Sequence, residues 1–253
     1  MQQRPTLTIN NVTFGDGKVK ICLPEVEKSE EAILKTIKGY EKFSGWDVLE
    51  VRLDFFDQIH DANAIKVLLN KVRQATSRLM LVTLRTKREG SALDVNDEDY
   101  LKIITSICES GVCDLVDIEL TRGDDLIKQC EEVAHAHNVK VIISKHDFDK
   151  TPSQNEMESL LYKMNELSGD ILKLAVMPHD KADVIELLGA TRAVSTHVHA
   201  PLITMSMGNL GSISRVIGGE FGSTMSFATA GKASAPGQVS LEKMSGLLKG
   251  VEK

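Results

Sequence analysis

Short apolar runs alternate along the chain with longer stretches in which apolar residues recur with helical periodicity. From Lys18 onward, eight runs of the first kind are each followed by one of the second. The apolar runs predict strands at 18–23, 47–54, 79–86, 115–120, 140–146, 171–177, 201–207 and 223–228. The periodic stretches predict helices at 28–43, 60–77, 97–110, 124–137, 153–167, 180–189, 209–217 and 239–249. Eight successive βα units indicate an α/β protein of the (β/α)8 TIM-barrel class.

The N-terminal segment predicts a β-hairpin. Its strands are expected at Leu7 to Phe14 and Lys18 to Leu23, around a turn at Gly15 to Gly17. The first of these strands is extra to the eight units and could cover the bottom of the barrel. A doubly wound open sheet is the alternative, but no G-x-G-x-x-G turn follows the first strand. No repeat, low-complexity tract or linker is visible, so residues 1–253 are expected to form a single domain.

Several predicted strands carry polar residues on one face only. Because side chains alternate along a strand, these residues share a face opposite the Leu, Val and Ile positions. The polar faces contain Glu50, Arg52 and Asp54; Thr83 and Arg85; Asp117 and Glu119; and Lys173 with Ala175. In a barrel they would line the interior and converge at the C-terminal ends of the strands, where barrel enzymes keep their active sites. The structural alternative is an ion network that only holds the barrel together.

Lys173 and His146 stand out because each lies in a run that is otherwise typical of a buried strand. An amine buried without a partner shifts its pKa down and becomes a nucleophile. Lys173 is therefore expected to form a Schiff base with a carbonyl substrate, and His146 to move protons. The interior arginines suit an anionic substrate, and no metal-ligand cluster is evident. These residues predict a Schiff-base lyase, but they do not distinguish an aldolase from a dehydratase.

Composition narrows the class of partner and the compartment. The formal charge of -6 and the lack of a basic run argue against nucleic acid. No apolar stretch reaches the roughly 18 residues needed to span a bilayer, and Met1 to Asn10 lack the features of a signal peptide. The four cysteines show no C-x-x-C spacing and are expected to be reduced core thiols. A cytoplasmic protein that acts on a small molecule is expected.

Nearly the whole chain resembles the type I 3-dehydroquinate dehydratase family. The resemblance is carried by runs of unusual composition spread from one end of the chain to the other. They are Glu50-Val-Arg52 with Asp54, Leu84-Arg-Thr-Lys-Arg-Glu-Gly90, Asp117-Ile-Glu-Leu120, Ser144-Lys-His-Asp-Phe148 followed by Thr151-Pro152, Lys173-Leu-Ala-Val-Met-Pro178, Ile203-Thr-Met-Ser-Met-Gly208, Ile213-Ser-Arg215 and Lys232-Ala-Ser-Ala-Pro-Gly-Gln238. One departure is Ser91, where many relatives have a second glycine after Glu89-Gly90.

The resemblance implies a homodimeric (β/α)8 barrel that needs no cofactor and converts 3-dehydroquinate to 3-dehydroshikimate by syn elimination of water. It implies that Lys173 forms the imine with the C3 ketone. His146 would take the C2 proton and then protonate the departing C1 hydroxyl, and Glu89 would orient His146. The further residues implied to contact the substrate are Arg215, Ser234 and Gln238 at its carboxylate, Glu50, Arg52 and Arg85 near its hydroxyls, Met205 and Phe227 as apolar walls, and Ala235.

The resemblance also gives a role to the segment from Ala233 to Gln238, whose composition alone indicates a plain surface loop. In the family this loop closes over the substrate and excludes water from the imine. Two alternatives remain beside the dehydratase. One is a Schiff-base aldolase on the same barrel, which would usually recognise a phosphate. The other is a non-catalytic barrel that binds a ligand.

Overall fold

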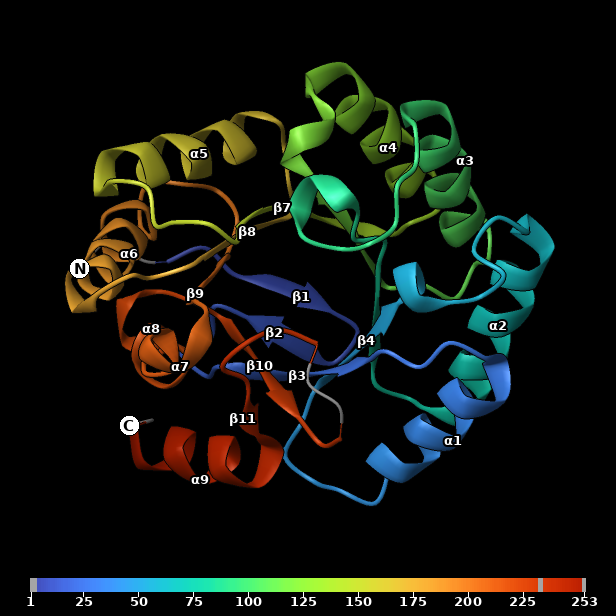
Figure 1. Cartoon of the computed structure of the whole chain (residues 1–253), viewed down its shortest axis with the longest axis horizontal. Helices are drawn as coiled ribbons and strands as arrows, with labels where there is room; N and C mark the ends of the chain where they lie inside the picture. The colour runs from blue at the N-terminus through green and yellow to red at the C-terminus, as the bar shows by residue number, and fades with distance from the viewer. Residues whose placement is uncertain (1–3, 232–233, 252–253) are drawn as a thin grey trace.

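A computed structural model describes residues 4–231 and 234–251 of the protein. Its centre is a parallel sheet that curls into a closed barrel (Figure 1). The barrel strands are β3 (Lys20–Glu25), β4 (Val48–Arg52), β5 (Leu79–Thr83), β6 (Leu115–Glu119), β7 (Lys140–Asp147), β8 (Ile171–Val176), β9 (Leu202–Ser206) and β10 (Met225–Thr229). Strands β3 to β9 pair in chain order, and β10 pairs with β3. The ring closes where Leu202 bridges Ser223 beside β10, which confirms the predicted barrel and excludes the open sheet.

Helices surround the barrel (Figure 1). They are α1 (Glu30–Tyr40), α2 (Ala62–Ala75), α3 (Asp97–Cys108), α4 (Asp124–Ala136), α5 (Gln154–Glu166), α6 (Lys181–Val194), α7 (Gly208–Gly211), α8 (Ser214–Phe221) and α9 (Leu241–Val251). Five of the helices begin at residues whose side-chain oxygen accepts a backbone N–H of the first turn, namely Ser29, Asp61, Asn96, Ser153 and Asp180. The helix predicted at 180–189 continues to Val194, and the one predicted at 209–217 is divided into α7 and α8. Within the described part of the chain, none of the helices has the length and apolar character that a membrane span requires.

The predicted hairpin exists, but its turn was misplaced. Strands β1 (Leu7–Ile9) and β2 (Val12–Phe14) pair antiparallel around Asn10, which takes a left-handed φ of 52°. Asparagine tolerates this conformation well, so a two-residue turn is possible there. The glycines at 15 and 17 instead connect the hairpin to β3, which runs parallel to β4 and β10 as the first barrel strand.

The barrel interior has an apolar lower half. Inward residues near the strand starts, such as Val48, Leu79, Leu115 and Ile171, form one buried cluster with Phe14 of the hairpin. The hairpin therefore closes the bottom of the barrel, as predicted. Outward residues on the same strands belong to a separate cluster under the helices. The remaining inward positions, nearer the C-terminal ends, are free to carry charge.

Three of these strands are followed by a short 3-10 turn. The turns are η1 (Leu53–Phe55) after β4, η2 (Lys87–Glu89) shortly after β5, and η3 (Leu120–Arg122) after β6. On the other side of the mouth, β10 leads through a loop to β11 (Val239–Ser240), which pairs parallel with β10. These segments bring side chains from both ends of the chain over the C-terminal mouth.

At the opposite end, the carboxylate of Asp114 joins three elements. Its Oδ2 accepts bonds from the Met80 backbone N–H (2.7 Å) and Arg73 Nη1 (3.0 Å), and its Oδ1 accepts one from Asn10 Nδ2 (3.0 Å). We expect Asp114→Ala to lower the free energy of unfolding by about 2–3 kcal/mol, because it removes two charge-assisted bonds and leaves a backbone donor without its partner. Urea denaturation measures this. Asn10→Gly removes only the exposed bond and keeps a residue that tolerates the left-handed φ, so it should cost less than about 1 kcal/mol; equal losses in the two variants would contradict this account.

Candidate active site

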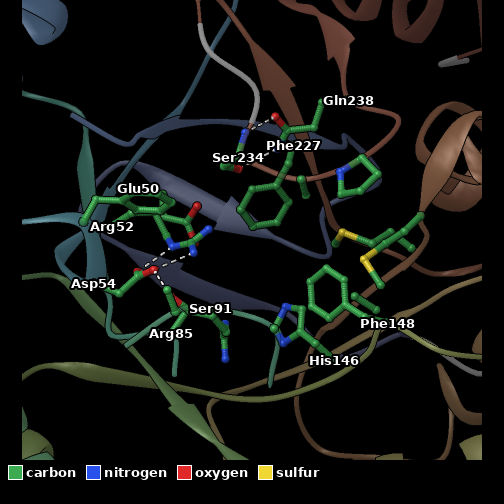
Figure 2. Close-up of a pocket in the computed structure, with 18 of the residues that line it drawn as sticks. Glu50, Arg52, Asp54, Arg85, Ser91, His146, Phe148, Phe227, Ser234 and Gln238 are labelled. Atoms are coloured by element: carbon green, nitrogen blue, oxygen red, sulfur yellow. Dashed lines mark hydrogen bonds and ion pairs between the residues drawn. The ribbon is translucent and has the colours of Figure 1, made fainter. Parts of the chain in front are cut away.

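A pocket of about 580 Å³ opens at the C-terminal mouth of the barrel. Figure 2 shows side chains from strands and loops on opposite sides of the barrel pointing into it. With the exception of Glu89, the site residues predicted from the sequence line its wall. Those that line it are Glu50, Arg52, Arg85, His146, Lys173, Met205, Arg215, Phe227, Ser234, Ala235 and Gln238. Lys232 and Ala233, from the last motif and the predicted loop, lie outside the described residues.

Lys173 lies on the inward face of β8, and its side chain is only 4% exposed. Its Nζ donates to Asp117 Oδ2 at 2.9 Å and lies 3.9 Å from Glu50 Oε1. The Phe227 ring covers the ammonium, with 4.8 Å between Nζ and the ring centroid. The inward position is as predicted. The premise of a buried charge without a partner was wrong, because Asp117 from β6 reaches the lysine across β7.

Asp117 is itself held by further donors. Its Oδ1 accepts bonds from Arg85 Nη2 (2.7 Å) and Ser144 Oγ (2.6 Å). Burial raises the pKa of this carboxyl, but Arg85 and Lys173 outweigh burial and keep the pKa well below its usual range. Asp117 is therefore an anion at neutral pH and can balance a positive charge on the lysine nitrogen, whether the group is an ammonium or an iminium.

Glu89 lies behind His146 rather than on the pocket wall. Its Oε2 accepts bonds from His146 Nδ1 and from the backbone N–H of His146, both at 2.9 Å, and its Oε1 accepts one from Thr121 Oγ1 (3.0 Å). Burial raises the pKa of Glu89 to about 7, although Arg85 lowers it. The bond to Nδ1 selects the tautomer in which Nε2 carries the lone pair.

His146 is neutral in this environment. Burial, with Arg85 and Lys173 nearby, lowers its pKa well below 6.5. Among the described residues, none forms a hydrogen bond with Nε2, and the ring lines the pocket. Phe148 stacks on the imidazole at 6.3 Å between ring centroids and 21° between planes. A neutral imidazole with an open Nε2 can accept a proton from a molecule in the pocket.

Arg215 is a buried cation of this pocket that lacks an acidic partner among the residues described. It lies on α8, is 3% exposed, and its buried Nε makes no hydrogen bond there. Its Nη2 donates to the Pro236 carbonyl at 3.3 Å. Burial lowers the pKa of Arg215 to about 10, so the group is still charged at neutral pH. A buried guanidinium without a carboxylate is suited to bind an anionic ligand.

The loop before β11 packs over this arginine. Pro236 also accepts the Gly208 backbone N–H at 3.2 Å, and Ser234 and Gln238 bond to each other through Oγ and Nε2 at 2.8 Å. A Cβ on Gly237 would come within 2.0 Å of the Gly208 carbonyl oxygen, so only glycine allows this approach. The loop is thus packed against the mouth of the barrel by backbone contacts.

Signals for the supporting residues were weaker in the sequence. Alternation placed Asp117 on an inward face, but it could not show that Asp117 would pair with Lys173. Ser144 lies two residues before His146 on the same face of β7, as strand alternation predicts, and Phe148 follows directly after the strand. Although Ser91 departs from the family pattern, Glu89 bonds directly to His146 and Ser91 bonds to Asp54.

Fold and pocket together define a (β/α)8-barrel protein whose ionisable groups gather at the C-terminal mouth, as in barrel enzymes. Residues 21–253 match the family model described as type I 3-dehydroquinase. The chain belongs to the type I 3-dehydroquinase family.

Relatives and solved structures agree with this assignment. The chain is 43% identical over 239 residues to the 3-dehydroquinate dehydratase of Listeria innocua, covering 94% of each protein. A crystal structure of the type I enzyme from Clostridium difficile, with covalently modified comenic acid, matches with a TM-score of 0.94 at 37% identity over 98% of each chain. The enzyme from Geobacillus kaustophilus matches with a TM-score of 0.95 at 33% identity, over 99% of this chain and 98% of that one.

The environment of His146 predicts a titration below its ordinary range. We expect the imidazole to stay neutral down to a pH well below 6.5, because burial and two neighbouring cations disfavour the charged form. Since the unfolded chain takes up this proton more readily, His146 should also lower the stability of the fold as the pH falls through 6.5. NMR titration of the ring protons, assigned with His146→Asn, measures the midpoint. A midpoint at or above 6.5 would show that the described surroundings do not govern this group.

Proposed function

We propose that this protein removes water from 3-dehydroquinate to give 3-dehydroshikimate through an imine on Lys173. The observation that carries the proposal is that three groups face one pocket: the Lys173 amine, the open Nε2 of His146, and Arg215, which has no carboxylate partner among the described residues. An amine nucleophile, a proton carrier and an anion site are the groups that such a reaction on a keto acid requires. The relatives named 3-dehydroquinate dehydratase supply the substrate.

The reaction begins when the Lys173 nitrogen, as the free amine, attacks the C3 carbonyl. His146, which accepted the proton that left the lysine ammonium, returns it to the carbinolamine oxygen. The oxygen leaves as water and gives an iminium, which draws electrons from the neighbouring carbon. His146 Nε2 then takes the C2 proton, and the electron pair of that bond moves into an enamine. The enamine expels the C1 hydroxyl, which receives the same proton from His146 and leaves as water. Hydrolysis of the resulting imine frees the product and restores the amine.

Use of one base for both proton transfers explains why the elimination would be syn. His146 lies on one side of the pocket, held by Glu89 and stacked on Phe148. The proton it removes and the hydroxyl it protonates must therefore lie on the same face of the ring. Glu89 orients the imidazole and offsets the positive charge that it carries between the two transfers.

Anionic residues surround the position of the iminium nitrogen. Asp117 contacts the lysine nitrogen at 2.9 Å, and Glu50 lies 3.9 Å away. Because both carboxylates are in place before the substrate arrives, little reorganisation is needed when the charge becomes permanent. The loop that contains Pro236 would keep water from the imine while elimination proceeds.

The remaining wall residues would hold the substrate. Arg215 is suited to the carboxylate, with Ser234, Ala235 and Gln238 covering it from the loop. Glu50, Arg52 and Arg85 would contact the ring hydroxyls, and Met205 and Phe227 would pack against the apolar faces of the ring. No residue role in this list requires a cofactor, and we propose that none is used.

We also propose that residues 1–253 act as one domain in the cytoplasm. The site draws on residues from Glu50 to Gln238, so a fragment that lacks either end of this range does not contain the whole site. The four cysteines are free and buried, which is typical of chains that fold under reducing conditions. Limited proteolysis of the native protein should therefore yield no stable fragment that retains activity.

A homodimer is the assembly that we propose. Ile185, Leu210 and Ile213 are 69%, 38% and 50% exposed on α6, on α7 and at the start of α8, which are neighbours in the fold (Figure 1). Exposed apolar side chains gathered in this way are typical of interfaces between subunits. Sedimentation velocity should give a dimer mass, and Ile185→Lys should shift the population to monomer. A monomer in the unmodified protein would contradict the proposal.

Lys173→Ala provides the main test of function. The variant should fold normally and lose turnover of 3-dehydroquinate by a factor on the order of 10⁴ or more, because no other group supplies the electron sink. Product absorbance measures the rate. Lys140→Ala, at the other end of the barrel, serves as the matched control and should remain active. Full activity in Lys173→Ala would exclude the imine mechanism, and an unmodified protein without turnover would favour a ligand-binding barrel.

A further inference from the structure

Ser91 lies at the pocket wall between the turn that carries Glu89 and the end of β4. Its backbone N–H donates to the Thr86 carbonyl at 3.0 Å, which ties it to the base of η2. Its hydroxyl points the other way and donates to Asp54 Oδ2 at 2.8 Å (Figure 2). The side chain therefore joins two segments that are far apart in the sequence.

The acceptor of this bond, Asp54, forms a two-pronged ion pair with Arg52. Arg52 Nε contacts Oδ1 and Nη2 contacts Oδ2, both at 2.8 Å, and the Asp54 side chain is fully buried. Burial lowers the pKa of Arg52, but Asp54 outweighs burial and raises it, so the guanidinium is a permanent cation. Oδ2 thus receives both the Ser91 hydroxyl and one arm of the arginine.

The arginine also has a free side. Its guanidinium carbon lies 5.1 Å from the centroid of the Phe55 ring, and among the described residues Nη1 forms no hydrogen bond. The planar guanidinium of Arg52 is held along one edge by the Asp54 carboxylate, so the two groups can rotate only together. The direction in which Nη1 points therefore depends on the Asp54 rotamer. The hydroxyl of Ser91, which follows the turn after the neighbouring strand β5, is the contact from outside the ion pair that holds this rotamer.

We propose that Ser91 is a positioning residue that aims Arg52 at the hydroxyl groups of the substrate by holding Asp54. This inference rests on the proposed function. Loss of the hydroxyl would free Asp54 and Arg52 to move as a pair and would weaken substrate binding. Among the described residues, neither Lys173 nor His146 forms a hydrogen bond with this pair, so the effect on kcat should be small.

Ser91→Ala tests the inference through the split between KM and kcat. We expect KM for 3-dehydroquinate to rise about tenfold, in keeping with the loss of one bond to a charged group, and kcat to stay within about twofold. Ser91→Thr keeps the hydroxyl and should bring KM back toward that of the unmodified enzyme.

A double-mutant cycle with Arg52→Lys separates positioning from simple support of the turn. Lysine cannot form the fork with Asp54, so Ser91→Ala should add little to KM in that background. An equal rise in KM in both backgrounds would overturn the proposal. A large fall in kcat in Ser91→Ala would also overturn it, because it would show that Ser91 acts through the Glu89 turn. These outcomes presuppose turnover by the unmodified enzyme; its absence would refute the proposed function instead.

Discussion

The guanidinium of Arg85 is the cation on which the polar half of the barrel depends. It is buried, and three carboxylates share it, with Asp117 at 2.7 Å, Glu119 at 3.2 Å and Glu89 at 3.4 Å. Three buried carboxylates this close together could not all be ionised without a central positive charge. Asp117 in turn holds Lys173, and Glu89 holds His146. One arginine therefore supports both reactive groups, although the two belong to different strands.

This arrangement explains how one barrel can be both a packed core and a reactive pocket. Apolar side chains and the N-terminal hairpin fill the lower interior, which provides the burial that stabilises the fold. The charged residues occupy the next inward positions, where they are paired with one another and shielded from water. The Arg52 and Asp54 pair sits at the rim with its free edge turned toward the pocket. Along the same strands, the apolar residues thus lie lowest, the charged groups above them, and the Arg52 and Asp54 pair at the rim.

Alternation and strand count predicted much of this from the sequence. They placed Lys173 on an inward face and His146 on the preceding strand. The register of β7 against β8 pairs Ser144 with Lys173 and His146 with Ala175, so the two groups lie on adjacent strands, two positions apart. Alternation and strand count could not predict contacts that depend on barrel curvature or on turns. Asp117 reaches Lys173 past an intervening strand, and Glu89 reaches His146 across 57 residues because η2 folds back over β7. The hairpin turn was predicted at Gly15 to Gly17 because glycine is the usual residue in turns. The actual turn is at Asn10, since asparagine also adopts the left-handed conformation.

In the proposed mechanism, the Lys173 nitrogen becomes covalently bound to the substrate carbon. The most direct test of this step is to reduce the unmodified protein with borohydride in the presence of 3-dehydroquinate and to map the peptides by mass spectrometry. We expect a stable adduct that is confined to the peptide containing Lys173 and that forms only when substrate is present. Continued turnover with no adduct, or an adduct on another lysine, would contradict it.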